Sequence, residues 1–176
     1  MTRYSLTPHP DHPPLGIRGV TVDLRVIDGG GVLLNYMVDS GEAVTWPERT
    51  SAVRSDGLWL TTCFELFLMF DDEEHYVEFN FSPSGAWAAY AFDGYRDGMA
   101  DLPRDVIPHV ERTADGVAVD CDLGGLPHGE LLMSLTAVIE EQGGRRSFWA
   151  LHHPPGAPDF HHRDCFAARL PAPAQP

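Results

Sequence analysis

The sequence predicts an all-β protein, an antiparallel β-sandwich with little helix. Three observations lead to this prediction. About ten short segments rich in aromatic and β-branched residues recur along the 176 residues. Turns rich in Gly, Pro and Asp separate these segments, and hardly any stretch shows the period of an amphipathic helix. Short strands between such turns are typical of two packed antiparallel sheets.

The first part of the chain predicts a proline-rich arm followed by a hairpin. Residues 1–17 hold one short edge segment, Tyr4–Leu6, and are otherwise predicted to be irregular because prolines interrupt strand pairing. Val20–Ile27 alternates apolar and polar residues, and the glycines after it predict a turn into a partner strand, Val32–Val38. The polar loop 39–58 is long for a compact domain, and such loops commonly carry function.

The centre of the chain predicts a three-stranded meander. Its first two strands, Thr62–Phe70 and Tyr76–Phe81, flank an acidic turn. A four-residue turn there pairs the apolar residues of the two strands, namely Phe64, Leu66 and Leu68 with Phe81, Phe79 and Val77. Because side chains alternate along a strand, a second, polar face results, and a one-residue slip would bury its carboxylates. That face carries Glu65, Phe67, Glu78 and Asn80.

Two further turns predict where two tryptophans lie. We treat residues 82–85 and 141–144 as four-residue turns as well. The predicted pairs are Trp87 with Asn80, Ala89 with Glu78 and Trp149 with Thr136, while Tyr90 and Phe92 join the apolar face. Both tryptophans then fall on polar faces, where a flat indole beside hydrogen-bonding groups suits a polyhydroxylated ligand. The alternative is core packing, because tryptophan in a sandwich is usually buried.

The remaining strands complete the sandwich. Two more hairpins are predicted, Val106–Arg112 with Val117–Asp122 and Leu131–Glu140 with Arg146–Leu151. A loop rich in histidine and proline leads to a closing strand, Cys165–Leu170. The tail, residues 171–176, is expected to be flexible. The length fits one domain, which we place over residues 1–176.

Composition excludes several classes of function. The formal charge of −14 and the absence of lysine argue against nucleic-acid binding and against anionic membrane surfaces, and exclude Schiff-base chemistry. The three cysteines are an odd number without the spacing of a metal site, so we expect free thiols in a reducing compartment. No apolar run is long enough to span a bilayer, and no leader is evident. We therefore expect a cytoplasmic protein.

Several motifs resemble one family. They are Asp56-Gly-Leu-Trp59, Thr62-Cys-Phe-Glu-Leu-Phe67, Tyr76-Val-Glu-Phe-Asn-Phe-Ser-Pro-Ser-Gly-Ala-Trp-Ala-Ala-Tyr90 and Pro158-Asp-Phe-His-His162. With them, most of residues 20–170 resembles the bacterial DOMON-like proteins related to family-nine carbohydrate-binding modules. The resemblance implies a jelly-roll or immunoglobulin-like sandwich whose concave face holds a sugar or a haem.

The resemblance also implies site residues. Family-nine modules clamp a sugar between two tryptophans and bind its hydroxyls with acidic, amide and arginine side chains. The matching residues here are Trp87 or Trp59 with Trp149, and Glu65, Glu78, Asn80 and Arg96. Those modules are usually secreted with a glycoside hydrolase, whereas we expect this chain to act alone and without a leader, which favours a small intracellular sugar or another small molecule.

Other functions stay open at this point. Glu65 and Glu78 also fit an acid and base pair for glycoside hydrolysis. Imidazole and carboxylate groups between His152 and Asp164 suit a divalent metal or a small-molecule enzyme; they are His152, His153, Asp159, His161, His162 and Asp164. A non-covalent haem would take its axial ligands from Met69, His75, Met99, His109 or Met133. An exposed sheet face that meets a protein partner is a third possibility.

Our leading hypothesis is a non-catalytic protein that binds a carbohydrate or a similar small polyhydroxylated ligand and needs no cofactor. Tryptophan stacking and charge-assisted hydrogen bonds would hold the ligand. The predicted ligand-binding residues are Trp59, Glu65, Glu78, Asn80, Trp87, Arg96, Trp149, His152 and His161.

Overall fold

The computed structural model describes residues 1–27, 29–40, 44–70, 74–124 and 131–170. Its secondary structure consists of antiparallel strands and two single-turn 3-10 helices, η1 (Leu58–Leu60) and η2 (Arg163–Cys165). The predicted antiparallel β-sandwich with little helix is therefore confirmed. No helix in the described part of the chain is long and apolar enough to cross a membrane. The predicted flexible tail lies outside the described residues.

Strand β1 (Thr2–Pro8) joins two sheets. Its first five residues pair with β2, from Thr2 opposite Leu24 to Leu6 opposite Val20. Its last two residues pair with β11, where Pro8 lies opposite Trp149. The prediction of a short edge segment in an irregular arm over residues 1–17 is wrong in this respect, because β1 has a neighbour on each side.

In the first sheet, β1 is followed by four strands in the order β2, β3, β9, β8. Their bounds are β2 Gly19–Ile27, β3 Gly31–Asp39, β9 Gly116–Asp122 and β8 His109–Arg112. Both hairpins of this sheet were predicted, although β8 begins three residues later than expected.

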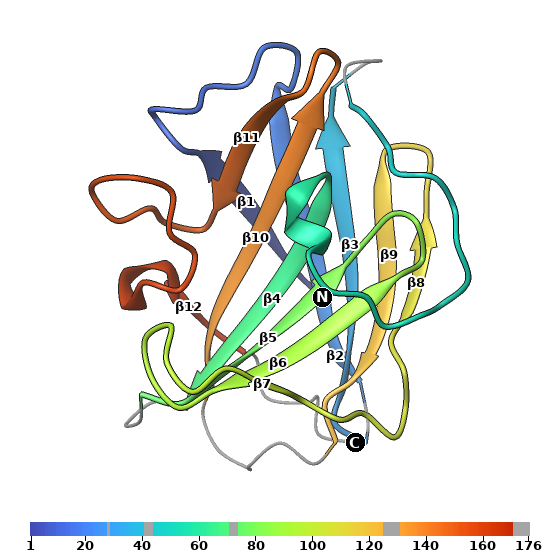
Figure 1. The fold of residues 1–176 in the computed structure, drawn as a ribbon, viewed down its shortest axis with the longest axis vertical. Helices are drawn as coiled ribbons and strands as arrows, with labels where there is room; N and C mark the ends of the chain where they lie inside the picture. Colours follow the sequence, from blue (N-terminus) through green and yellow to red (C-terminus); the bar gives the residue numbers. More distant parts are fainter. Residues whose placement is uncertain (28, 41–43, 71–73, 125–130, 171–176) are drawn as a thin grey trace.

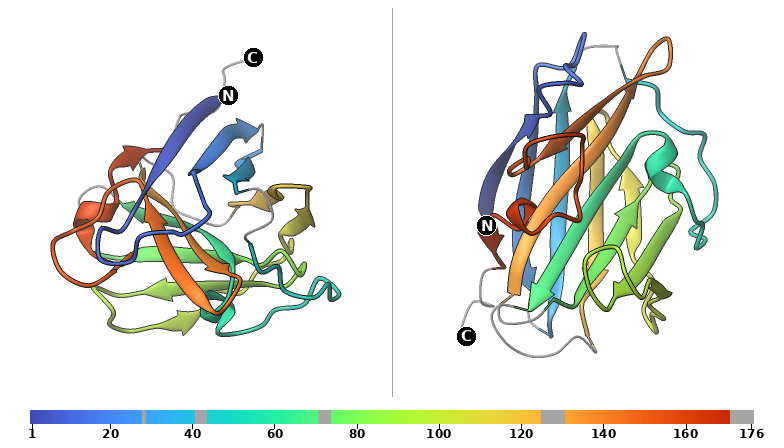
Figure 2. Two further views of the ribbon diagram at one scale, coloured as in Figure 1. Left: turned by 90° about the horizontal axis from the view of Figure 1, so that it is seen from above. Right: turned by 60° about the vertical axis from the view of Figure 1, so that its left-hand side comes forward.

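The second sheet runs in the order β7, β6, β5, β4, β10, β11, and β12 pairs with β10 beside β11. Its strands are β4 Cys63–Phe70, β5 Tyr76–Phe81, β6 Trp87–Phe92, β7 Ala100–Asp101, β10 Leu131–Glu141, β11 Arg145–Ala150 and β12 Ala168–Arg169. Figures 1 and 2 show the two layers, with β4, β5 and β6 running diagonally across β2, β3 and β9. The predicted closing strand, Cys165–Leu170, is reduced to the two residues of β12.

The main core lies between the two sheets. Alternate residues of the facing strands, such as Val22, Leu34, Leu66 and Phe79, are fully or almost fully buried there. The Tyr36 side chain crosses the core, and its hydroxyl donates a hydrogen bond of 2.6 Å to the main-chain oxygen of Glu65. This bond satisfies a buried polar group and ties β3 to β4.

The predicted register of β4 and β5 is confirmed. Phe64, Leu66 and Leu68 lie opposite Phe81, Phe79 and Val77. Glu65 lies opposite Asn80, and Phe67 lies opposite Glu78. Because alternate residues point to opposite faces, the apolar set faces the core and both carboxylates face outward.

The predicted register of β5 and β6 is wrong by one residue. Phe81, not Asn80, lies opposite Trp87, and Phe79 lies opposite Ala89. The turn between them holds five residues and is closed by a hydrogen bond of 2.9 Å from Ser82 N to Ala86 O. A one-residue shift exchanges the two faces. Trp87 therefore packs in the core, and Tyr90 and Phe92 lie on the outer face.

The same error affects the hairpin of β10 and β11. Trp149 lies opposite Ala137 rather than Thr136, because the turn holds three residues and not four. Two of those residues, Gly143 and Gly144, have φ of 91° and 80°, which glycine adopts without strain. Trp149 is 2% exposed and Trp87 is 5% exposed, so core packing is the correct interpretation of both.

A truncation at Trp149 tests this position in the core. Trp149→Ala should lower the free energy of unfolding by about 3–5 kcal/mol, because it removes a large side chain packed between the sheets. Trp59→Ala, at the partly exposed helix η1, should cost less than about 1 kcal/mol. Urea unfolding of the two variants measures both values. A loss below about 1 kcal/mol for Trp149→Ala would contradict the observed register.

Candidate functional site

The outer face of the second sheet carries a second apolar cluster rather than a solvated surface. Its members come from β4, β5, β6, β10, β11 and the segment that follows β11; they are Phe67, Met69, Tyr76, Ala88, Tyr90, Phe92, Val138, Ala150, Phe160 and Phe166. Figure 2 (right) shows this face with η1 and the loops 93–99 and 151–166 around it. These segments enclose a pocket on the sheet.

This outer-face pocket has a volume of about 370 Å³. It is lined by Trp59, Glu65, Phe67, Glu78, Phe92, Arg96, Met99, Val138, Arg146, Phe148, Pro158, Phe160 and His161. A volume above about 300 Å³ with mostly apolar walls and a few convergent polar groups is typical of a small-molecule site.

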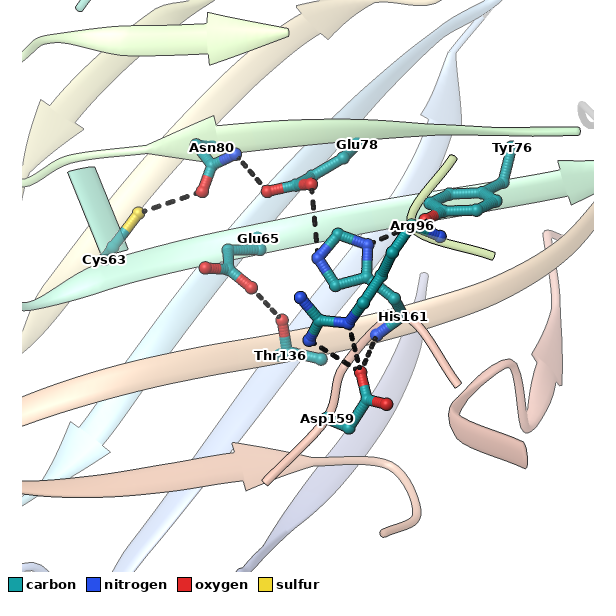
Figure 3. Close-up of polar contacts among 9 residues, drawn as sticks. All are labelled: Cys63, Glu65, Tyr76, Glu78, Asn80, Arg96, Thr136, Asp159 and His161. Carbon is teal, nitrogen blue, oxygen red and sulfur yellow. Dashed lines mark hydrogen bonds and ion pairs between the residues drawn. The ribbon is translucent and has the colours of Figure 1, made fainter. Parts of the chain in front are cut away.

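Two buried carboxylates form the polar part of the pocket floor. Glu65 of β4 is 2% exposed and Glu78 of β5 is 5% exposed. Thr136 Oγ1 donates to Glu65 Oε2 at 2.6 Å, and Asn80 Nδ2 donates to Glu78 Oε1 at 2.6 Å (Figure 3). Asn80 thus lies beside Glu78 and positions it.

Burial makes both carboxyl groups weak acids. Burial, with a smaller contribution from the nearby charge of Glu78, raises the pKa of Glu65 from 4.5 to about 8. Burial also raises the pKa of Glu78 to about 7, although the hydrogen bond from Asn80 and the charge of Arg96 oppose the shift. The pair therefore retains protons close to neutral pH.

His161 reaches the same floor from the loop after β11. Its Nε2 lies 3.9 Å from Glu78 Oε2, and its Nδ1 lies 2.8 Å from the Tyr76 hydroxyl. That hydroxyl accepts a bond of 3.2 Å from Arg96 N, so its own proton is available for Nδ1. With Nδ1 as the acceptor of this bond, the neutral imidazole holds its proton on Nε2, on the side of the ring that faces Glu78. Burial, aided by the charge of Arg96, lowers the pKa of His161 to about 4, so the ring is neutral at pH 7.

Arg96 is held in a strained conformation by Asp159. Its φ is 53°, the left-handed region, where a side chain costs roughly 1–2 kcal/mol. Asp159 Oδ1 accepts from Arg96 Nη2 at 2.8 Å and from His161 N at 3.1 Å (Figure 3). The Tyr95 hydroxyl also donates to Asp159. One carboxylate therefore ties loop 93–99 to the loop that carries His161. Strain maintained in this way is frequent at functional sites.

Trp59 stands at the edge of the pocket on η1 and is 37% exposed. Its ring meets the ring of Tyr90 edge to face, with centroids 6.2 Å apart. Tyr90 is fixed in turn, because its hydroxyl donates to Asp56 Oδ1 at 2.7 Å and Arg54 lies over its ring. The end of loop 39–58 and η1 thus bring Arg54, Asp56 and Trp59 to the central meander.

The structure brings together most of the predicted site. Five predicted residues line the pocket, namely Trp59, Glu65, Glu78, Arg96 and His161. The prediction that Trp87 and Trp149 lie on a polar face is wrong, and His152 is exposed and does not line the pocket. Sequence reasoning missed the aromatic walls Phe92, Phe148 and Phe160 and the positioning role of Tyr76. Correct turn lengths would have placed Phe92 and Phe148 on this face.

The histidines and acids of the 152–164 segment do not converge. His153 Nε2 lies 2.9 Å from Thr7 O, His162 lies 3.7 Å from Asp164, and His161 bonds to Tyr76. Within the described residues, no group of three or more His, Cys, Asp or Glu side chains is arranged to hold a metal ion.

Comparisons with known proteins support the fold. No family model matches the sequence, and no curated protein matches it either. The structure is similar to the crystal structure of a "putative carbohydrate-binding protein" from Bacteroides uniformis ATCC 8492, with a TM-score of 0.69 and 12% sequence identity. The similarity covers 93% of this chain and 83% of that chain. At this identity it concerns the fold alone.

The raised pKa values predict how stability depends on pH. Glu65 and Glu78 bind protons more tightly in the folded protein than in the unfolded chain, so their stabilisation is complete below pH 4.5 and is lost as pH rises through about 7 and about 8. His161 acts in the opposite direction, because its stabilisation is lost only as pH falls from 6.5 toward about 4. Of these three groups, only the two glutamates change the stability as pH rises from 6.5 to 8.5.

We therefore expect wild-type stability to fall between pH 6.5 and 8.5, by at most about 1.4 kcal/mol per pH unit for each proton lost. The double variant Glu65→Gln/Glu78→Gln should show little of this fall and should unfold at a higher temperature than wild type at pH 8.5. Thermal unfolding across this range measures both effects. The exposed Glu111→Gln on β8 is the control and should follow wild type. Equal pH dependence in the double variant would refute the shifted pKa values.

Proposed function

We propose that this protein binds a carbohydrate, or a similarly small polyhydroxylated ligand, in the outer-face pocket. One observation carries the proposal. Two buried carboxylates, a guanidinium group and a neutral imidazole converge on a pocket of about 370 Å³ that has an indole at its edge. This combination offers both acceptors and donors to hydroxyl groups beside a flat apolar surface.

Each pocket group has a role in this binding mode. Glu65 and Glu78 accept hydrogen bonds from ligand hydroxyls, and Arg96 and His161 Nε2–H donate to ligand oxygens. The apolar face of a pyranose ring stacks on Trp59, as sugars do on aromatic rings. Asn80, Thr136, Tyr76 and Asp159 hold the contacting residues in place. Neither a cofactor nor a catalytic step is required.

Two similarities support the same class of ligand. The structural neighbour is described as a "putative carbohydrate-binding protein" and shares the fold over most of both chains. The sequence resembles the DOMON-like proteins related to family-nine modules. The sequence hypothesis paired Trp87 or Trp59 with Trp149 as the stacking surface, whereas here Trp59 serves alone.

Calorimetry with a panel of monosaccharides and disaccharides tests the proposal. At least one sugar should bind, and Trp59→Ala should weaken that binding about tenfold or more, because the stacking surface is lost. Leu60→Ala is the matched control, since Leu60 lies next to Trp59 on η1 and is exposed without lining the pocket. A panel without any binding sugar, or equal affinity in Trp59→Ala, would overturn the proposal.

A further inference from the structure

We propose that the ligand of the outer-face pocket carries a basic amino group, as an amino sugar does, and that Glu65 and Glu78 together hold its ammonium group. The inference rests on the proposed function and names the class of ligand within it. Among the residues that the structure describes, neither carboxylate forms an ion pair with an arginine.

Buried carboxylates normally have a cationic partner or several hydrogen-bond donors. Glu65 accepts one bond from Thr136, and Glu78 accepts one bond from Asn80. Within the described residues, no arginine forms an ion pair with either carboxylate, and the imidazole 3.9 Å from Glu78 is neutral at pH 7. Each carboxylate on the pocket floor can therefore accept further hydrogen bonds from a ligand in the pocket.

The two arginines that line the pocket have other partners. Arg96 contacts Asp159 Oδ1 through Nε at 3.3 Å and through Nη2 at 2.8 Å, so the charges of these two residues compensate each other. Arg146 is exposed and donates to the main-chain oxygen of Leu60 at 3.3 Å. In the described ranges of the chain, neither guanidinium forms an ion pair with the carboxylates, although the charge of Arg96 partly stabilises ionised Glu78. A cation supplied by the ligand would pair with both carboxylates.

The walls of the pocket suit a cation as well. Phe67, Phe92, Phe148 and Phe160 line it together with Trp59. The faces of aromatic rings attract an ammonium group, and the attraction increases when water is excluded. The net charge of −14 also favours the approach of cationic ligands over anionic ones.

A proton takes the place of the cation in the free protein. The pKa values of about 8 for Glu65 and about 7 for Glu78 keep the pair partly protonated at pH 7. An ammonium group between the two carboxylates favours their ionised forms, so its binding releases roughly one proton to the buffer. A neutral sugar brings no charge and should release far less. A sugar acid would meet repulsion from the ionised floor.

Titration calorimetry at pH 7, in two buffers of different ionisation enthalpy, tests the inference. The probes are glucosamine, galactosamine and mannosamine, each compared with its parent sugar and its N-acetyl derivative, together with cyclohexylamine. At least one amino sugar should bind tenfold or more tighter than its two neutral counterparts and should release roughly one proton.

The variant Glu65→Gln/Glu78→Gln should bind that amino sugar no tighter than the parent sugar and release no proton, whereas Glu111→Gln should behave as wild type. If the double variant does not fold, Glu78→Gln alone should reduce the preference severalfold. Parent sugars that bind as tightly as the amino sugars, without proton release, would overturn the inference and leave the proposed function standing. Binding of cyclohexylamine without any sugar would overturn the proposed function and leave the role of the carboxylates standing. Absence of all binding would overturn both.

Discussion

The pairing of β4 with β5 determines both the core and the pocket. In this register Phe64 and Leu66 point inward with the side chains opposite them, and the same alternation directs Glu65 and Glu78 outward. The two strands lie in the middle of the second sheet, between β10 and β6. Loops 93–99 and 151–166 and η1 surround the pocket on the outer face, so the carboxylates are buried even though they do not point into the core.

Burial of these two acids lowers the stability of the protein near neutral pH. Tyr76, Asn80, Thr136 and Asp159 supply hydrogen bonds around the pocket, but none of the bonds supplies a positive charge to the floor. Arg96 adds strain through its left-handed backbone. Buried carboxylates with few hydrogen-bond partners and a strained residue beside the same pocket are typical of a ligand-binding site, where the ligand supplies the missing interactions.

The sequence predicted the strand pairing correctly where apolar and polar side chains alternate along the strands. The faces of β4 and β5 differ sharply, so Glu65, Glu78 and Asn80 were placed correctly relative to each other. Strand β6 has bulky apolar residues on both faces, Trp87 on one and Tyr90 and Phe92 on the other, so the pattern did not reveal the five-residue turn before it. Strand β11 also has bulky apolar residues on both faces, Trp149 on one and Phe148 on the other, so the pattern did not reveal the three-residue turn before it. The contacts of Asp159 and His161 with the meander join loops far apart in the chain, which spacing alone does not predict.

The central claim is that Glu65 and Glu78 form a buried pair of weak acids that a ligand neutralises. Carbon-13 NMR titration of the glutamate side-chain carboxyl groups measures it directly in the free protein. The structure predicts two glutamates that titrate near pH 7 and pH 8 and whose signals disappear from that range in Glu65→Gln/Glu78→Gln. Titration of both residues near their ordinary pKa of 4.5 would contradict the account.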